Sequence, residues 1–138
     1  MIVNIYTDGG ARGNPGPAGF GVVIYDENKK IIYKNACYIG IKTNNEAEYL
    51  ALINALEWLS KNKTNFAISQ MAFFSDSQLM VRQLQGVYKI KAPHLKELNH
   101  QCVSLLSLIN LPYTFNDIRR EFNQLADELA NTAMDNHK

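Results

Sequence analysis

Apolar and polar positions in the first forty residues form three segments that favour β-strands. Residues 2–7, 19–25 and 30–38 are rich in β-branched and aromatic side chains, which suit a pleated, half-buried surface. The connections between them are glycine-rich or short and polar. Three consecutive strands joined in this way predict an antiparallel meander.

The period of the apolar positions changes further along the chain. Leucines and alanine at helical spacing predict a helix over 46–60, with its apolar stripe at Leu52, Ala55, Leu56 and Leu59. The pattern then predicts, in order, a strand over 68–75, helices over 78–84 and 93–109, a strand over 112–118 and a helix over 123–134. This order predicts an α/β fold with a five-stranded mixed sheet flanked by helices, in which the last two strands run parallel to the first.

The composition predicts a single domain over residues 1–138. Hydrophobic residues make up 46% of the chain and charged residues 20%, which is typical of a globular protein with a substantial core. No apolar run reaches the ~18 residues that cross a bilayer, and no leader-like segment opens the chain, so we expect a cytoplasmic protein without membrane contact. Cys37 and Cys102 fit no metal-binding spacing and favour free thiols. A monomer without an obligate protein partner is the default expectation.

The first predicted strand ends at Asp8, and a run of glycines follows it. An acid at the end of a strand, beside a loop whose backbone can approach a ligand closely, is typical of a binding site. The alternative is an ordinary turn, because Asp-Gly is a common turn dipeptide and Pro15 and Pro17 mark a loop in any case. The glycines of this run are Gly9, Gly10, Gly13, Gly16 and Gly19.

Three further acids stand where predicted elements begin or end, and each has a structural alternative. Glu48 is three residues after Asn45, which resembles a capping box, but it also precedes Leu52 by one helical turn and so lies on the inward stripe. Asp76 follows a strand and precedes a helix, where it would serve as an N-cap. Asp127 lies in the first turn of the last helix, where the helix dipole favours an acid on the surface.

Taken together, the four acids favour a metal site. Asp8 and Asp76 follow strands while Glu48 and Asp127 begin helices, and in an open sheet these ends gather at one edge. Clustered carboxylates repel one another unless cations lie between them. Oxygen ligands select Mg²⁺ or Mn²⁺, and two such ions roughly 3.5–4 Å apart suit phosphoryl displacement. The histidines form no pattern that predicts a zinc site: His94, His100 and His137.

Four motifs spread over nearly the whole chain resemble the type 1 ribonuclease H family, which cleaves the RNA strand of RNA–DNA hybrids. Each motif is moderately specific, and the four in this order and spacing are highly specific. They are Tyr6-Thr7-Asp8-Gly9-Gly10 with Gly13-Asn14-Pro15-Gly16, Thr43-Asn44-Asn45-x-x-Glu48, Ser75-Asp76-Ser77-Gln78, and Asn123-x-x-Ala126-Asp127-x-Leu129-Ala130.

The resemblance implies a ribonuclease H-like fold and a two-metal endonuclease that leaves 5′-phosphate and 3′-hydroxyl ends. Its catalytic, metal-binding carboxylates fall on Asp8, Glu48, Asp76 and Asp127, with two Mg²⁺ ions as cofactors and Mn²⁺ as a substitute. Side-chain amides suit contacts with 2′-hydroxyls and base edges in the minor groove of a hybrid. A phosphate-binding P-loop is excluded because no Gly-Lys-Ser/Thr follows the glycines. The substrate-contacting positions are Gly9, Gly10, Asn14, Thr43, Asn44, Asn45, Ser77, Gln78 and Asn123.

The segment before the last predicted helix departs from the pattern of many members of the family. Residues 117–122 read Asp-Ile-Arg-Arg-Glu-Phe, without the histidine that those members carry there. The segment resembles a shorter subgroup in which an arginine takes over a supporting role, and we assign that role to Arg120. The alternative is a solvated pair, Arg119 and Arg120, that only screens charge.

The chain also departs from many members of the family in the basic residues that would contact the DNA strand. Many members have an extra basic helix and loop, for which residues 85–94 leave little room. Lys89, Lys91 and Lys96 give a modest basic segment, which is either a DNA contact or an ordinary solvated connection. We therefore expect weak substrate binding that falls steeply with salt, because phosphate contacts supply most of the affinity.

Two rival functions fit the same fold. A non-catalytic hybrid-binding domain would gain nothing from four intact acids beside phosphates. Another nuclease of this fold, such as a resolvase, a transposase or a double-stranded-RNA nuclease, is disfavoured by Asn14, Asn44 and Asn45. Cleavage of different duplexes discriminates among these functions.

Overall fold

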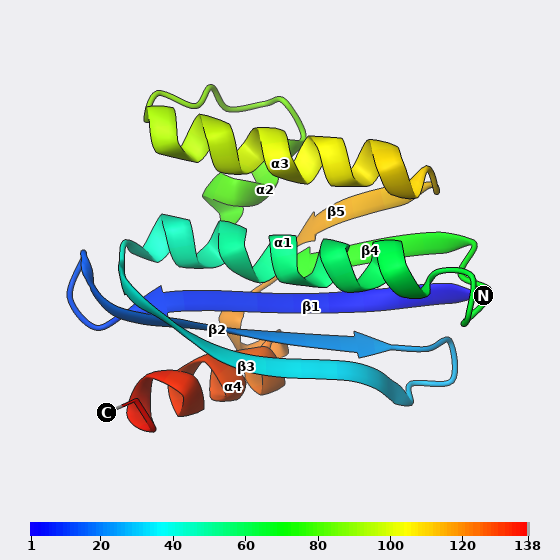
Figure 1. Ribbon diagram of the computed structural model, residues 1–138, viewed down its shortest axis with the longest axis horizontal. Helices are drawn as coiled ribbons and strands as arrows, with labels where there is room; N and C mark the ends of the chain where they lie inside the picture. Colours follow the sequence, from blue (N-terminus) through cyan, green and yellow to red (C-terminus); the bar gives the residue numbers. More distant parts are fainter. Residues whose placement is uncertain (138) are drawn as a thin grey trace.

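A computed structural model describes residues 1–137 of the chain (Figure 1). The strands are β1 (Ile2–Ala11), β2 (Gly16–Tyr25), β3 (Ile31–Lys42), β4 (Gln70–Ser75) and β5 (Tyr113–Asp117). The helices are α1 (Asn44–Asn62), α2 (Gln78–Leu84), α3 (Pro93–Ile109), the short 3₁₀ helix η1 (Arg120–Phe122) and α4 (Gln124–Asp135).

The five strands form one sheet in the order β3-β2-β1-β4-β5. β1, β2 and β3 are antiparallel neighbours, whereas β4 is parallel to β1 and β5 is parallel to β4. The predicted fold class, a mixed sheet with its last two strands parallel to the first, is confirmed. β1 occupies the centre because its two neighbours come from the hairpin and from the crossover through α1 (Figure 1).

The first hairpin is longer than the sequence predicted. β1 continues past Asp8 to Ala11 and β2 starts at Gly16, so the connecting turn covers only residues 12–15. The glycines that predicted a loop pair within the ladder instead, with Gly9 opposite Phe20 and Gly10 opposite Gly19. A long neighbouring strand supplies hydrogen bonds that override the poor strand propensity of glycine.

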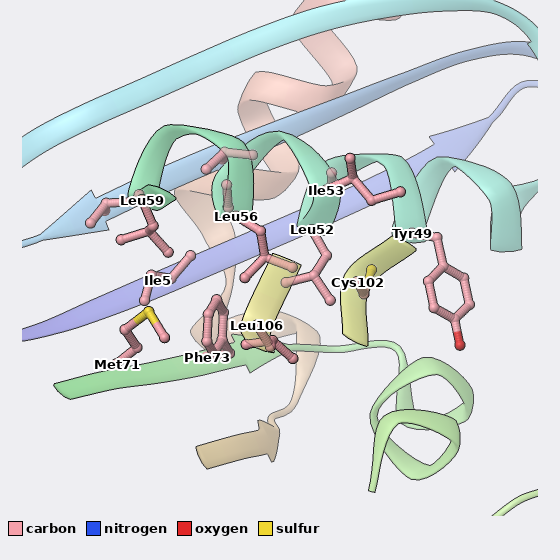
Figure 2. Packing of buried hydrophobic residues seen from close by; sticks show 14 of the residues in the cluster. Ile5, Tyr49, Leu52, Ile53, Leu56, Leu59, Met71, Phe73, Cys102 and Leu106 are labelled. Atoms are coloured by element: carbon pink, nitrogen blue, oxygen red, sulfur yellow. The ribbon is translucent and has the colours of Figure 1, made fainter. Parts of the chain in front are cut away.

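The hydrophobic core lies between the sheet and the helix pair α1–α3, with α1 directly on the sheet (Figures 1 and 2). All four residues of the predicted apolar stripe are buried: Leu52, Ala55, Leu56 and Leu59. Figure 2 shows Leu52, Leu56 and Leu59 above Met71 and Phe73 of β4, and Cys102 and Leu106 of α3 close the cluster. Both cysteines are free, as predicted.

Aromatic residues near the edge of the core differ in how deeply they are buried. Phe115 packs partly buried against Phe73, with ring centroids 5.0 Å apart, and Trp58 stacks on Tyr33 at the rim of the core. Tyr113, in contrast, is 47% exposed, because β5 is an edge strand and residue 113 begins it. Among residues 1–137, the structure has no helix with the length and apolarity needed to cross a membrane.

Candidate active site

Side chains of the four acids line one cavity of about 410 Å³ at the end of the sheet where β4 stops. One carboxylate oxygen each of Asp8, Glu48 and Asp76 lies within 4.8 Å of the other two. Asp127 reaches the same cavity from the first turn of α4, beside Asp8. The predicted meeting of the four acids at one edge of the sheet is therefore confirmed, although they lie up to 119 residues apart in the chain (127 − 8).

The end of β4, not the end of β1, creates this edge. Parallel pairing between β1 and β4 stops at the pair Thr7 and Ser75, and Asp8 and Asp76 are the next residue of each strand. Asp8 lies inside β1 and still pairs with Gly21 of β2, so the prediction that the strand ends at Asp8 is wrong. The geometric consequence is unchanged, because both acids emerge where the parallel ladder stops.

Two backbone groups of β1, one at the end of the pairing with β4 and one beyond it, receive side-chain partners from α1 and from the N-cap residue of α4. The Gly9 N–H donates to Glu48 Oε1 at 2.9 Å, and Asn123 Nδ2 donates to the Thr7 carbonyl at 2.9 Å. Backbone groups without partners are costly when buried, so these bonds complete the unfinished ladder. They also fix α1 and the start of α4 beside Asp8.

Asn123, which the sequence predicted as a substrate contact, lies buried at the junction of the sheet and α4. Its side chain is only 2% exposed and is committed to the Thr7 carbonyl. A contact of Asn123 with substrate stays a prediction. It joins the sheet to α4, whose first turn carries Asp127.

The cap of α1 also differs from the predicted one and releases Glu48 for the cavity. The N-cap is Thr43, whose Oγ1 accepts from the Glu46 N–H at 3.2 Å, while Glu46 Oε1 accepts from the Thr43 N–H at 3.0 Å. The capping box lies two residues before Asn45 and Glu48, for which it was the structural alternative, so Glu48 is not part of the cap. Glu46 occupies the third helical position, so Glu48 lies two residues further into the helix. Its side chain is 8% exposed and lines the cavity.

Asp76 is not a helix cap either. Ser77 is the N-cap of α2, and its side chain accepts from the Met80 N–H at 3.2 Å. Asp76 Oδ2 is buried and has no hydrogen-bond partner, and the nearest cation is Arg120 Nε at 3.8 Å. A buried carboxylate oxygen without a partner is costly, so this oxygen suits a bound cation.

The acids raise one another's affinity for protons. Burial, followed by the neighbouring charges of Asp76 and Asp127, raises the pKa of Asp8 from 3.8 to about 8. Burial and then the charges of Asp8 and Asp76 raise the pKa of Glu48 well above its usual range. Burial also raises the pKa of Asp76, against the opposing effects of a hydrogen bond with Asp8 and of the Arg120 charge. Without a cation the cluster holds protons that a free carboxylate would release.

This donor set fits a divalent cation of the hard type. The ligand atoms are carboxylate oxygens within reach of one another, and Asp76 Oδ2 lacks a partner. Oxygen-only ligands match Mg²⁺ and Mn²⁺ rather than zinc. Asp8, Glu48 and Asp76 have carboxylate oxygens close enough together to hold one ion, and Asp127 lines the same cavity, where it would help to hold a second.

Six of the predicted substrate residues divide into three groups by what their side chains do. Asn44 and Asn14 hold the β1–β2 turn against α1: the Asn44 N–H donates to Asn14 Oδ1 at 2.9 Å, and the Ala11 N–H donates to Asn44 Oδ1 at 2.8 Å. Their side-chain NH₂ groups are not used in these bonds. The Asn45 and Gln78 side chains are exposed at the first turns of α1 and α2. The Thr43 and Ser77 hydroxyls serve as helix caps, as described above.

Sequence reasoning missed a network that joins the hairpin to α4. The Arg12 guanidinium pairs with Asp135 and donates to Asn131 Oδ1 at 3.4 Å, and Asn131 Nδ2 in turn donates to Asp127 Oδ2 at 3.3 Å. Arg12 and Asn131 both line the acidic cavity. No local motif could have revealed Arg12, because its partners are more than a hundred residues away (131 − 12 = 119). The i, i+4 spacing of Asp127 and Asn131 on a helix was the available signal.

Because protons and cations compete for these oxygens, we expect cation binding to depend on pH. Below pH 8 a cation must displace the proton that Asp8 holds, so its affinity falls as the pH falls. Millimolar MgCl₂ should raise the melting temperature more at pH 8.5 than at pH 6, with NaCl of the same ionic strength as the control. An equal rise at both pH values, or an equal rise with NaCl, would contradict a cation site at these acids.

Comparisons with known proteins agree with this geometry. A family model described as "Reverse transcriptase-like" matches residues 6–133. The ribonuclease HI of Halobacterium salinarum is 37% identical over 133 residues, which cover 96% of this chain and 64% of the relative. A bifunctional protein of Mycobacterium tuberculosis is 38% identical over 136 residues, 98% of this chain but 36% of the relative. The chain thus spans roughly a third of the mycobacterial protein.

Solved structures extend the similarity to three dimensions. LC11-RNase H1, solved in complex with an RNA/DNA hybrid, has a TM-score of 0.91 and 48% identity, with 96% of each chain covered. RNase H1 of Halobacterium salinarum has a TM-score of 0.89 and 36% identity, with 99% of this chain and 100% of that chain covered. On the shared fold, the length of the match and the level of identity, the chain belongs to the type 1 ribonuclease H family.

Proposed function

We propose that the chain is a divalent-metal-dependent endonuclease that hydrolyses the RNA strand of RNA–DNA hybrids and leaves 5′-phosphate and 3′-hydroxyl ends. The observation that carries this proposal is the convergence of four carboxylates on one cavity, with Asp76 Oδ2 buried and unpartnered. Family membership and the hybrid bound to the related LC11 enzyme support the substrate class. We further propose a single catalytic domain over residues 1–138 that acts as a monomer in the cytoplasm.

The carboxylates are proposed to hold two Mg²⁺ ions, with Mn²⁺ as a substitute. Asp8 would bridge both ions, Glu48 and Asp76 would complete one site, and Asp127 would complete the other. When bound, such ions supply a nucleophilic water at neutral pH and neutralise charge on the attacking and leaving oxygens. The protein fixes this donor set in advance: the Gly9 N–H orients Glu48, and Asn131 orients Asp127.

Recognition of the hybrid is proposed to rest on side-chain and backbone groups around the cavity. The free amide NH₂ groups of Asn14 and Asn44, and the exposed Asn45 and Gln78, would contact 2′-hydroxyls and base edges without demanding a sequence. Gly9 and Gly10 would bring backbone close to the RNA strand. Thr43 would lie near a DNA phosphate, and Ser77, next to Asp76, would contact the substrate beside it. Glu48 suits a hydrogen bond to the 2′-hydroxyl near the cut, which would select RNA for hydrolysis.

Cleavage of defined duplexes tests the proposal. The protein is incubated with labelled RNA–DNA hybrid, double-stranded RNA and double-stranded DNA, each with MgCl₂, MnCl₂ or chelator. We expect the RNA strand of the hybrid to be cut only with a divalent ion, and end analysis to show 5′-phosphates. Hybrid binding without cleavage under every ion would favour the non-catalytic binder, and equal cutting of double-stranded RNA would broaden the substrate class.

Arg120 is proposed to support the reaction in place of a loop histidine. Its side chain is 84% exposed, so it is free to move, yet Nε lies 3.8 Å from Asp76 Oδ2 and its charge lowers the pKa of Asp76. Arg120→Ala should reduce kcat about tenfold and move the acidic limb of the pH–rate profile to higher pH, because Asp76 would then keep its proton to a higher pH.

Arg119 provides the matched control for this substitution. It is 80% exposed and pairs with Glu121 at 3.5 Å rather than with a cavity acid. Arg119→Ala should leave kcat and the acidic limb within about twofold of the native protein, since a surface pair contributes little. Equal effects of the two substitutions would show that both arginines only screen charge, and would contradict a specific role for Arg120.

A further inference from the structure

A second cavity lies on the same face of the sheet as Asp8. It has a volume of about 280 Å³ between β1, β2, the turn after β2 and the segment that enters α4. Alternate residues of a strand share a face, so Asn4, Tyr6 and Asp8 of β1 form one row. Tyr6 lines the second cavity and Asp8 the acidic one, about 7 Å apart along the strand. The two cavities therefore lie side by side, and nothing in the proposed function uses the second.

Three aromatic side chains line this second cavity. Tyr6 and Tyr25 meet edge to face with ring centroids 5.6 Å apart, and both line it. Phe122, on η1, lines it as well and is 67% exposed, which is unusual for a phenylalanine in a well-packed domain. Walls of this kind favour a planar ligand over an aliphatic one.

Polar residues border the second cavity, and one buried oxygen among them has no hydrogen-bond partner. Asn123 borders it, and although its Nδ2 is bonded to Thr7, its buried Oδ1 accepts no hydrogen bond within residues 1–137. An N–H donor on a ligand would satisfy that oxygen once the Asn123 side chain, which is 2% exposed, turns it toward the cavity. The Asn4 amide adds a donor and an acceptor, and Lys29 adds a positive charge at the mouth.

We propose that this cavity binds a nucleobase, either of a free nucleotide or of an unpaired residue in a nucleic-acid strand. A nucleobase combines an aromatic face for the tyrosine and phenylalanine walls with N–H donors and ring acceptors for Asn123 and Asn4. Its attached phosphate would be attracted by Lys29. An aliphatic ligand would leave Asn123 Oδ1 unpaired.

Occupancy of the second cavity would be transmitted to the acids through Asn123. This residue bonds to Thr7, the neighbour of Asp8, and directly precedes α4, whose first turn carries Asp127. A ligand on Asn123 Oδ1 would therefore stabilise the junction that positions two of the four carboxylates. Binding itself requires no hydrolysis and can be measured without it.

The test is an NMR titration of the native protein with nucleoside 5′-monophosphates in EDTA, with ribose 5-phosphate as the probe that lacks a base. The nucleotides should shift the amide signals of Tyr6, Tyr25 and Asn123 and saturate them, whereas ribose 5-phosphate should not. Phe122→Ala should raise Kd about five- to tenfold, because one stacking wall is lost. Tyr113→Ala removes an aromatic residue of similar exposure on β5, outside the second cavity, and should leave Kd unchanged.

A second arm identifies the source of the base. Native and Phe122→Ala proteins are compared in EDTA for binding to a blunt hybrid and to a hybrid with a single-stranded extension. Weaker binding of the variant to the extended hybrid alone assigns the site to a strand, and nucleotide binding without that difference assigns it to free nucleotides. Shifts confined to the acidic cavity, equal shifts with ribose 5-phosphate, or equal effects of Phe122→Ala and Tyr113→Ala would overturn the proposal. A protein that binds nucleotides here but cuts no hybrid would instead remove the proposed function alone.

Discussion

Replacing Asp8 by asparagine is expected to abolish hydrolysis and, in chelator at pH 8, to make the protein more stable than the native one. Activity should fall by at least about a thousandfold, because the candidate bridging ligand loses its charge. Binding of the hybrid should be retained or improved, since a negative charge beside the phosphates is removed. The two effects have one origin, the cost of holding this carboxylate among the other acids.

The gain in stability follows from the raised pKa of Asp8. The folded protein holds the Asp8 proton up to about pH 8, whereas the unfolded chain releases it near 3.8. The folded state therefore binds more protons between these values, and its stability falls as the pH rises from about 4 to about 8. Asparagine removes this loss. We expect the variant to gain of the order of 2–4 kcal/mol at pH 8, and much less at pH 5.

Thermal unfolding of both proteins at pH 5 and pH 8, in chelator and in MgCl₂, measures this effect. Glu27→Gln, which alters an exposed acid in the β2–β3 turn, should change neither stability nor its pH dependence. In MgCl₂ the advantage of Asp8→Asn should shrink or reverse, because only the native protein gains from the cation. A variant that cuts hybrid at the native rate would refute the metal assignment, and one that is less stable at pH 8 in chelator would refute the electrostatic account.

The sequence predicted the sheet and the edge at which the acids meet because both depend on local patterns. The 2-residue and 3.6-residue periods identified the elements, and the parallel crossover constrained where their ends lie. The predicted end of β1 failed because the strand continues to Ala11 through its pairing with β2. The α1 cap was missed although it is local, since Thr43 and Glu46 have the spacing of a capping box.

The role of each residue in the site was harder to predict than which residues form the site. Asn123 carries a family motif, but only the structure shows that it is buried and bonded to Thr7 rather than exposed to substrate. Arg12 carries no motif, and its link to α4 depends on packing between elements far apart in the chain. The glycines show the same limit. Their sequence pattern predicted a flexible loop, while the structure places Gly9 and Gly10 in a strand and sets Gly9 against α1.

Gly9 and Gly10 therefore make a matched pair for the second large effect. A Cβ built on Gly9 would lie 2.4 Å from the backbone carbon of Ala47 and 2.6 Å from the Glu48 nitrogen, so α1 would have to move. A Cβ on Gly10 would meet only Met134 Cε, at 3.7 Å, an ordinary contact. Gly9 is required for the space it leaves and not for an unusual backbone angle, since its φ is not positive.

Gly9→Ala should lower the free energy of unfolding by about 3 kcal/mol, the upper range for overpacking against backbone that cannot relax locally. It should also reduce the rise in melting temperature caused by MgCl₂, because Glu48 lies on the displaced helix and loses its 2.9 Å bond from the residue 9 N–H. Gly10→Ala should change stability by less than about 1 kcal/mol and keep the full response to MgCl₂. Urea unfolding with and without MgCl₂ compares the two. Equal losses in both variants would show that the glycines act alike, through substrate access or strand flexibility, and that Gly9 does not set the position of Glu48.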